Sequence, residues 1–319
     1  ATTFWSKFSY SRKISTLRYP LHESCYNMSE TPIQIQFKNR QNPRASFDLI
    51  QLEELAHRKN LQHSPFQLHL VRFYLLLIVE EGQGAHTIDF TSYPIERGSI
   101  VTIRKDQIQR FHQSKSLKGQ MLLFTDDFLV SYLEQLEALK SLQLFNEVLG
   151  TPVIKLHEAE FVKVLEQIED IQHEYFDVND SYSQGIIRSE LHILLAKLYR
   201  IKSKIHPTIL DRKYLAEFVT FQNLVEEQAR FSNRVNYYAQ LMNVSTKTLN
   251  TISQAIVKKT AKAFIDEIAT KQIKRLLINT DLSVKEIAYA SGFEEPTNFY
   301  KYFKRQTQNT PEQFRAHHK

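Results

Sequence analysis

Cysteine and long hydrophobic runs are nearly absent from this 319-residue sequence. The single cysteine, Cys25, excludes an internal disulfide and is typical of a protein from a reducing compartment. The longest apolar run covers only residues 73–79, whereas a membrane-spanning helix needs about 20 residues. We therefore expect a cytoplasmic protein with no membrane partner. A hydrophobic content of 42% with 24% charged residues also excludes disorder as the main state.

Glycine is scarce as well, and three of the seven glycines interrupt a single stretch of the chain. Gly82, Gly84 and Gly98 separate short runs of β-branched and aromatic residues, which favour strands. The predicted strands cover 67–79, 85–90, 99–103, 107–112 and 120–124. No helical pattern lies between them, so tight turns must join them, as in an antiparallel sandwich or a small barrel. Of these two we predict a β-barrel.

Helical periodicity replaces the strand pattern after position 126. Three helices are predicted, at 128–149, 157–176 and 182–204. The third carries one apolar stripe with three-to-four spacing. The stripe consists of Ile187, Leu191, Leu194, Leu195, Leu198 and Ile201. It packs either on its own barrel or on a second copy of itself, and the second alternative predicts a homodimer through 182–204.

The positive charge of the chain is confined to its last third. Residues 211–319 contain 17 basic and 11 acidic side chains, which accounts for the whole net charge of +6. The preceding part has 24 of each and is neutral. A stretch at 203–212 with Pro207 breaks the helical pattern just before this basic region, so we place a linker there. Such asymmetry indicates a nucleic-acid or membrane surface as a partner.

The basic region contains two diverged copies of one helix-turn-helix pattern, about 50 residues apart. In each copy a small residue, Ala239 or Ala288, lies in the first helix, where a second helix must cross closely. Four residues later comes Asn243 or Gly292, the residue types that best adopt the left-handed conformation ending a helix. Two such units in a positively charged domain favour DNA binding over an ordinary helical hairpin.

Capping signals define where the helices of these units begin. Ser245 is an N-cap for the second helix of the first unit, and Glu295 with Pro296 begins the second helix of the other. Ser283 and Glu286 have the spacing of a capping box before the second unit. These signals predict helices at 235–242, 246–257, 261–278, 284–290, 296–306 and 311–316, after a helix at 212–229.

The second helix of each unit is expected to enter the major groove and to present its exposed side chains to the bases. In the first unit these side chains are Lys247, Asn250, Thr251 and Gln254. In the second they are Thr297, Asn298, Tyr300 and Lys301, with Lys304 and Arg305 holding phosphates. Six further cations are expected to be solvated or to contact phosphate: Lys258, Lys259, Lys262, Lys271, Lys274 and Arg275.

The second unit resembles the signature of the AraC/XylS family of bacterial transcription regulators. The matching residues are Ile287-Ala288, Ser291-Gly292-Phe293, Phe299-Tyr300-Lys301-Tyr302-Phe303-Lys304, Thr310-Pro311 and Phe314-Arg315. The resemblance implies an activator with two helix-turn-helix subdomains joined by a long helix, here 261–278, and RNA polymerase as a partner. The sequence departs from the family in having Lys258 and Gln308 in place of glycines, and Thr251 and Lys301 in place of arginines.

The predicted barrel is similar to the cupin-like sensing domain of the same family. The similarity lies in Phe73-Tyr74, Glu81-Gly82, Gly84, His86-Thr87-Ile88, Tyr93, Ile95 and Gly98. It implies that a small-molecule effector binds in the barrel and that the following helices dimerise. The polar groups suited to orient an anion or a polyol are His69, Arg72, Tyr74, His86 and Arg104.

A metal-binding cupin would need two or three clustered histidines and a carboxylate. His69 stands where the family often has the first histidine of a pair, but position 71 is Val71, and Gln109 replaces the late histidine. We therefore predict no metal, no cofactor and no enzymatic activity.

These observations predict an α+β two-domain protein that regulates transcription. The expected parts are an irregular N-terminal arm at 1–30, a cupin-like sensing and dimerisation domain at 31–202, a linker at 203–212 and an AraC-type DNA-binding domain at 213–319. We expect binding to double-stranded DNA under control of a small-molecule effector. Two alternatives stay open, a metal-dependent cupin enzyme fused to a helical domain and a DNA-binding protein without an effector.

Overall fold

The computed structural model describes most of the chain beyond position 32. The described residues are 33–39, 42, 45–55, 64–114, 116–130, 144–146, 151–205, 214–228 and 234–318. The predicted arm at 1–30 lies outside them, as does most of the predicted helix at 128–149. Within the described part of the chain, no helix is both long and apolar enough to cross a membrane.

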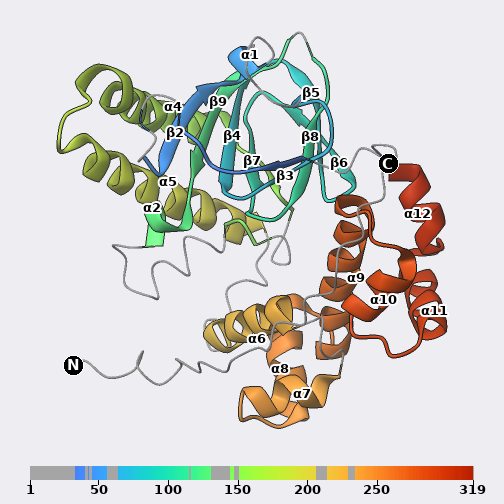
Figure 1. The fold of residues 1–319 in the computed structure, drawn as a ribbon. Helices are drawn as coiled ribbons and strands as arrows, with labels where there is room; N and C mark the ends of the chain where they lie inside the picture. The colour runs from blue at the N-terminus through green and yellow to red at the C-terminus, as the bar shows by residue number, and fades with distance from the viewer. Residues whose placement is uncertain are drawn as a thin grey trace. The chain divides into compact units, whose positions relative to one another are not determined.

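The N-terminal part forms two five-stranded sheets that lie face to face (Figure 1). The first sheet has the order β1 (Ile33–Ile35), β3 (His69–Val71), β8 (Ile108–Phe111), β5 (Gln83–Ile88) and β6 (Thr91–Glu96). The second has the order β10 (Val153–Lys155), β7 (Ser99–Ile103), β4 (Tyr74–Glu81), β9 (Lys118–Phe124) and β2 (Phe47–Gln51). Among the strand pairs of the described residues, β1 with β3 is the parallel one. No described strand pairs with both sheets, so the expected barrel is an open sandwich.

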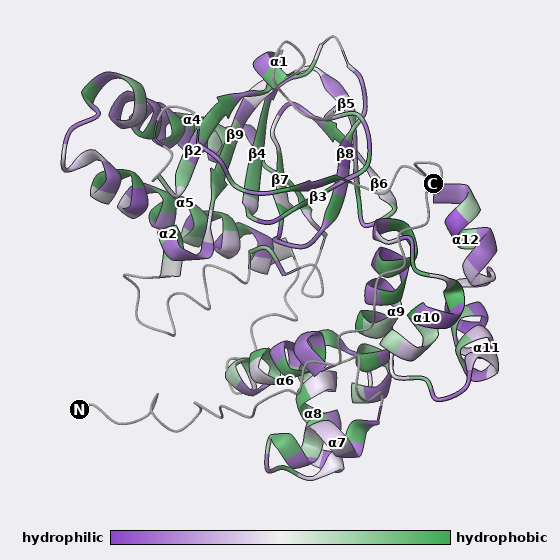
Figure 2. Cartoon of the chain, viewed as in Figure 1, coloured by the Kyte–Doolittle hydropathy of each residue, from purple (hydrophilic) through white to green (hydrophobic). Residues whose placement is uncertain are grey.

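Strand β4 explains the long apolar run of the sequence, because both of its faces are covered. Leu75, Leu77 and Val79 point into the core between the two sheets. Tyr74, Leu76 and Ile78 belong to a separate core, on the outer face of the second sheet. A strand buried on both faces is apolar at successive positions rather than at alternate ones, which is why most of β4 is coloured hydrophobic in Figure 2, whereas its last two residues are glutamates.

Helices α4 (Glu158–Gln172) and α5 (Ser183–Ile205) supply the other half of that outer core. Five of the six residues of the predicted stripe are at most 3% exposed there, and Ile201 packs against them. The stripe therefore packs on its own domain, the first of the two alternatives. A short α1 (Leu52–Leu55) follows β2, α2 (Asp126–Val130) follows β9, and a π-helix, η2 (His173–Val178), follows α4.

The C-terminal part is entirely helical over its described residues. Its elements are α6 (Leu215–Gln228), α7 (Val235–Leu241), α8 (Thr246–Val257), α9 (Ala261–Asn279), α10 (Val284–Ala290), α11 (Pro296–Thr307) and α12 (Pro311–His318). The long helix α9 contributes to two cores. Its first half packs with α6, α7 and α8 around Phe264, and its second half packs with α10, α11 and α12 around Leu277. The fold class is thus confirmed, a β-rich domain followed by a helical domain with two subdomains.

Four strands were not predicted from the sequence: β1, β2, β6 and β10. All four lie at sheet edges, β1 and β6 in the first sheet and β10 and β2 in the second. Strand β6 contains Pro94 and is exposed at most positions, as an edge strand tolerates. Strands β1 and β10 have only three residues each, too few for an alternating pattern to be recognised in the sequence.

Candidate nucleic-acid interface

The turn between α7 and α8 has the geometry that its sequence predicts. Asn243 adopts the left-handed conformation with φ of 53°, and the N–H of Val244 donates to the carbonyl of Ala239 at 3.0 Å. Ser245 then caps α8, since its hydroxyl accepts from the N–H of Thr248 at 3.0 Å. The cap satisfies one of the N–H groups that a helix start leaves without a partner.

The turn between α10 and α11 repeats this geometry with different residues. Gly292 has φ of 80°, and the N–H of Phe293 donates to the carbonyl of Ala288 at 3.0 Å, the same bond as in the first unit. Pro296 occupies the first turn of α11, but the Glu295 side chain makes no capping bond. The predicted cap at this position is therefore limited to the proline.

The capping box that precedes the second unit is present. The N–H of Glu286 donates to the Ser283 hydroxyl at 3.2 Å, and the N–H of Ser283 donates to the Glu286 carboxylate at 2.8 Å. Hydrogen bonds from the Ser283 side chain and from its backbone N–H to the carboxylate hold the pKa of Glu286 below its ordinary value.

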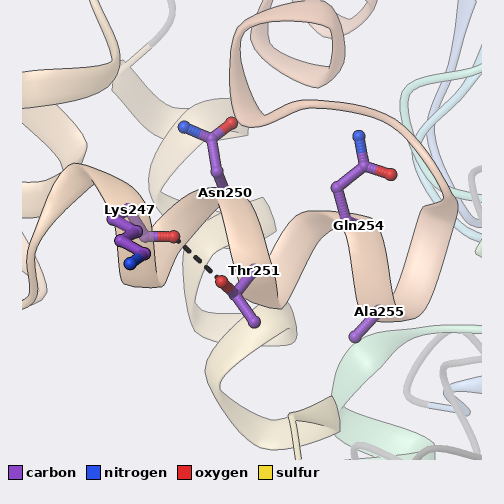
Figure 3. Close-up of a pocket in the computed structure, with 5 residues that line it drawn as sticks. All are labelled: Lys247, Asn250, Thr251, Gln254 and Ala255. Carbon is purple, nitrogen blue, oxygen red and sulfur yellow. Dashed lines mark hydrogen bonds between the residues drawn. The ribbon is translucent and has the colours of Figure 1, made fainter.

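Helix α8 buries one face and exposes the other. Leu249, Ile252 and Ile256 are at most 1% exposed and belong to the first helical core. Figure 3 shows the opposite side, where five side chains line a shallow hollow. They are Lys247, Asn250, Thr251, Gln254 and Ala255. Among them the side chains of Lys247, Thr251 and Gln254 are exposed, as a base-reading role requires.

Helix α11 has the same two-sided character. Phe299, Tyr302 and Phe303 are buried in the second helical core. The predicted reading residues Thr297, Asn298 and Lys301 are exposed, and so are the predicted phosphate contacts Lys304 and Arg305. The guanidinium of Arg305 lies 5.7 Å from the centre of the Tyr302 ring. This contact keeps the charged end of the arginine near the buried face of α11.

Two of the ten predicted DNA contacts are bonded to another helix, and the hydroxyl of a third, Thr251, donates within α8 to the carbonyl of Lys247 at 3.1 Å (Figure 3). The Asn250 side chain accepts from the N–H of Ala261 at 2.9 Å and donates to the carbonyl of Thr246 at 3.0 Å. The Tyr300 hydroxyl donates to the carboxylate of Glu312, which raises the pKa of Tyr300 to about 12. Sequence spacing placed both residues on the exposed face and gave no sign of these bonds.

Several other cations of the helical domain are also paired. Lys259 and Lys271 bind Glu267, and Lys262 binds Asp266. Arg275 forms a bidentate ion pair with Asp89 of the sheet domain, at 2.6 and 2.9 Å, with both side chains largely buried. Arg275 is thereby used in contact between domains rather than exposed to solvent.

The five effector candidates fall into two groups. His69 and His86 lie on the inward face of the first sheet, because His69 pairs in register with Gln109 and Gln109 with the core residue Ile88. His86 is fully buried, and its Nε2 lies 2.7 Å from Oε1 of Gln109. Burial lowers the pKa of His86 to about 3, so the imidazole is neutral and donates this bond.

Arg72, Tyr74 and Arg104 instead line a cavity of about 690 Å³ between the sheets and helices α6 and α9. Both of these arginines have a partner. Arg72 binds Asp106, and Nη1 of Arg104 donates to both carboxylate oxygens of Glu226 in α6, at 2.8 and 2.9 Å. Burial and the neighbouring Asp126 raise the pKa of Tyr74, so its hydroxyl stays protonated. The sequence gave no sign that α6 and α9 would complete this cavity.

The described residues contain no group of three or more His, Cys, Asp and Glu side chains arranged to hold a metal ion.

Comparison with known proteins supports the same two domains. A family model described as the AraC-like ligand binding domain matches residues 52–195, and a helix-turn-helix domain model matches residues 238–317. The HTH-type transcriptional activator RhaR of Enterobacter sp. (strain 638) is 22% identical over 255 residues, covering 78% of this chain and 87% of RhaR. The activator RhaS of Escherichia coli O139:H28 is 20% identical over 263 residues, covering 82% and 91%.

The chain matches solved structures of a full-length protein and of a C-terminal domain, among others. ToxT from Vibrio cholerae strain SCE256, solved with a bound unsaturated fatty acid, has a TM-score of 0.40 and 16% identity, covering 78% of this chain and 89% of ToxT. The C-terminal domain of the response regulator yesN from Fusobacterium nucleatum has a TM-score of 0.30 and 26% identity, covering 31% and 98%. On the two family models and the helix-turn-helix signature, the chain belongs to the AraC/XylS family of transcription regulators.

Proposed function

We propose that the protein is a sequence-specific DNA-binding transcription factor, an activator rather than an enzyme, controlled by a small-molecule effector. The observation that carries this proposal is the repeated geometry of its two helix-turn-helix units. Each unit buries one face of its second helix and exposes polar side chains on the other. The net charge of +6 resides in the same part of the chain. A positively charged domain with two such helices suits two adjacent segments of the major groove.

Some of the exposed side chains read bases, and others bind phosphates. Gln254 and Asn298 have the amide that pairs with adenine, and Lys247 and Lys301 reach guanine. Lys304 and Arg305, near the end of α11, bind phosphates. Base choice then depends on a few side chains, whereas affinity depends mostly on phosphate contacts and falls steeply with salt.

The cavity lined by Arg72, Tyr74 and Arg104 is the proposed effector site. It brings three of the five candidate residues together with charged groups of α6 and α9. A polar ligand bound there would compete with Asp106 for Arg72 and with Glu226 for Arg104. Glu226 belongs to the helical domain. Loss of its ion pair with Arg104 would therefore change a direct contact between the sensing domain and the DNA-binding domain. His69 and His86, enclosed between the sheets, belong to the sensing domain without lining this cavity.

Homodimerisation and RNA polymerase contact complete the proposal for this cytoplasmic regulator. The apolar stripe of α5 is used within its own domain, but the outer side of α5 exposes Ile186 and Ile193 at 40% and 43%, and Tyr182, just before the helix, is 74% exposed. This outer side supports dimerisation through 182–204. Replacing Ile193 with Glu should convert a dimer to a monomer in analytical ultracentrifugation, whereas a monomeric wild-type chain would exclude the dimer.

Selection from random DNA duplexes by the full-length chain tests the proposed function. We expect a motif with two recognised segments about one helical turn, or about 10 base pairs, apart. Mapping of bound sites across the genome should return the same motif upstream of regulated genes. Enrichment of no motif would reject sequence-specific recognition and favour the alternative of a DNA-binding protein without sequence preference.

A further inference from the structure

The fifth residue of each second helix is bonded to the helix that follows it. Counted from the first helical residues, Thr246 of α8 and Pro296 of α11, these residues are Asn250 and Tyr300. They occupy equivalent positions in the two units and differ in chemistry. Both face the side of the helix that sequence spacing assigns to DNA, so their intramolecular bonds bear on which residues read bases.

In the first unit, Asn250 joins α8 to the start of α9. Its side-chain oxygen accepts from the N–H of Ala261, the first residue of α9. That N–H has no partner within its own helix, as is general for the first turn. The Asn250 amide nitrogen donates to the carbonyl of Thr246, one turn earlier. Bidentate pairing with adenine needs the same oxygen and nitrogen, so both atoms are already engaged.

A second bond in the first unit reinforces this connection. The hydroxyl of the buried Ser253 donates to the carbonyl of Lys259, in the segment between α8 and α9, at 2.8 Å. Asn250 and Ser253 lie three residues apart, on adjacent turns of α8. Together they hold the end of α8 against the entry to α9.

In the second unit the direction of the bond is reversed, for a reason visible in the sequence. The residue equivalent to Ala261 is Pro311, the first residue of α12, and proline has no N–H to donate. An asparagine at position 300 would find no such donor. Instead Tyr300 supplies the hydrogen and the next residue of α12, Glu312, supplies the acceptor. The Tyr300 ring also contacts Phe299, edge-on at 6.1 Å between ring centres.

We propose that Asn250 and Tyr300 are positioning residues, which set the angle of each recognition helix against the following helix and do not read bases. The inference rests on the proposed function and specifies how its two DNA-reading surfaces are held. Base choice then falls to the exposed side chains of the two helices, which are Lys247, Thr251 and Gln254 in α8 and Thr297, Asn298 and Lys301 in α11. Both units thus connect the second helix to the helix that follows. The first unit does so with an asparagine and a backbone N–H, and the second with a tyrosine and a carboxylate.

A double-mutant cycle tests the second unit, with Tyr300→Phe, Glu312→Ala and the double variant in the full-length chain. Tyr300→Phe keeps the ring and removes only the hydroxyl. We expect each single change to weaken binding by about three- to tenfold on every DNA sequence, the range that one hydrogen bond supplies. The double variant should lose no more than either single one, and Glu312→Gln, which keeps an acceptor, should restore most of the affinity.

Base preference, measured at each position of the motif, distinguishes a positioning residue from a base-reading one. Selection with Tyr300→Phe should return the wild-type motif, whereas the neighbouring control Lys301→Ala should lose preference at one or two base pairs. The same comparison applies to Asn250→Ala against Thr251→Ala in the first unit. Far-ultraviolet circular dichroism and thermal unfolding identify any variant that does not fold, and the conservative Tyr300→Phe variant keeps the comparison available if Asn250→Ala is such a variant.

Three results would overturn the inference. They are a changed base preference in Tyr300→Phe or Asn250→Ala, unchanged affinity in both, and additive losses in the Tyr300–Glu312 cycle. Each requires that the wild-type chain first returns a motif. A wild-type chain that returns none refutes the proposed function itself, so the two failures are distinguishable.

Discussion

Single residues after the two recognition helices adopt a backbone conformation that favours glycine. Lys258 follows α8 with φ of 55°, and Gln308 follows α11 with φ of 63°. The N–H of each donates to a carbonyl four residues earlier and closes the helix end. The family often has glycine at both positions, and the structure shows why. For other residues this left-handed conformation costs about 1 kcal/mol or more.

Glycine at either position should therefore stabilise the protein. We expect Lys258→Gly and Gln308→Gly each to raise the free energy of unfolding by about 0.5 to 1 kcal/mol, since relief of strain exceeds the added freedom of the unfolded chain. Urea unfolding measures the change. As a control, Gln306→Gly within exposed α11 should destabilise by about 1 kcal/mol, and equal effects at positions 306 and 308 would contradict the strain argument.

At the same scale, DNA-reading and phosphate-binding residues should respond differently to alanine. Lys301→Ala and Asn298→Ala remove exposed groups from the reading face of α11, so preference should relax at particular base pairs, at about 1 to 3 kcal/mol per pair. Arg305→Ala should weaken binding on all sequences and reduce the slope of log K against log salt by about 1. Titrations on matched and mismatched duplexes separate these results, and equal loss across sequences for all three variants would refute the assigned roles.

The helices of the two units are defined chiefly by their ends. Ser245 and Ser283 both accept from a backbone N–H three residues on, and the Glu286 carboxylate returns a bond to Ser283. Glu295 stands at the equivalent position before α11 and makes no such bond. Helices as short as α10, with seven residues, depend on such caps because their few internal hydrogen bonds barely offset the cost of nucleation.

Removal of a serine cap should lower the stability of the protein, whereas removal of the Glu295 side chain should not. We expect Ser283→Ala and Ser245→Ala each to lower the free energy of unfolding by about 1 kcal/mol, and Glu295→Ala to have almost no effect. Thermal and urea unfolding provide the comparison. A loss in Glu295→Ala as large as in the serine variants would show that capping is not the cause.

The capping box also predicts a dependence on pH. Because the folded pKa of Glu286 is lowered, its contribution is present above the ordinary glutamate pKa near 4.5 and is lost as pH falls through the folded value. Glu286→Gln should remove this part of the acid sensitivity. An unchanged pH profile of unfolding between about pH 5 and 3 would show that the carboxylate contributes nothing.

At the scale of the whole molecule, the buried ion pair between Asp89 and Arg275 links the sheet domain to α9. Asp89 also accepts from the N–H of Ile108 and from the Gln107 amide. Burial by itself would raise the pKa of Asp89, but the Arg275 guanidinium outweighs it and keeps that pKa below its ordinary value. Next to it, Phe90 packs edge-on against Phe314 of α12, at 5.2 Å between ring centres.

Breaking this ion pair on one side should be costly. Arg275→Met leaves a buried carboxylate without its partner, so we expect a loss of about 3 kcal/mol or more in the free energy of unfolding, and Arg275→Met with Asp89→Asn should recover much of it. Since the pKa of Asp89 is lowered, the stabilisation is present above about pH 4 and lost below it. Urea unfolding at pH 7 and at lower pH values, down to about pH 2, checks both statements. A double variant no more stable than the single one would argue against an uncompensated charge.

Prediction from sequence succeeded where local rules decide the structure. The bounds of α8 and α10 follow directly from Ser245 and Ser283, and β7 from its β-branched run after Gly98. Strand β6 was missed because its hairpin turn, Asp89–Phe90, has a phenylalanine where such turns usually have glycine, although both residues have positive φ. Such a turn favours glycine or asparagine. Here contacts from the helical domain, Arg275 and Phe314, hold it in place.

The sequence by itself determined the two-domain order, the double helix-turn-helix and the family, because caps, periodicity and charge act over short distances along the chain. Only the tertiary structure decided which exposed polar residues are engaged. Asn250 meets the N–H of Ala261, Tyr300 meets Glu312, and Arg104 meets Glu226 of a distant helix. Hydrogen bonds and ion pairs require atoms within about 3 Å, and that proximity depends on how helices and sheets pack, which local patterns do not encode.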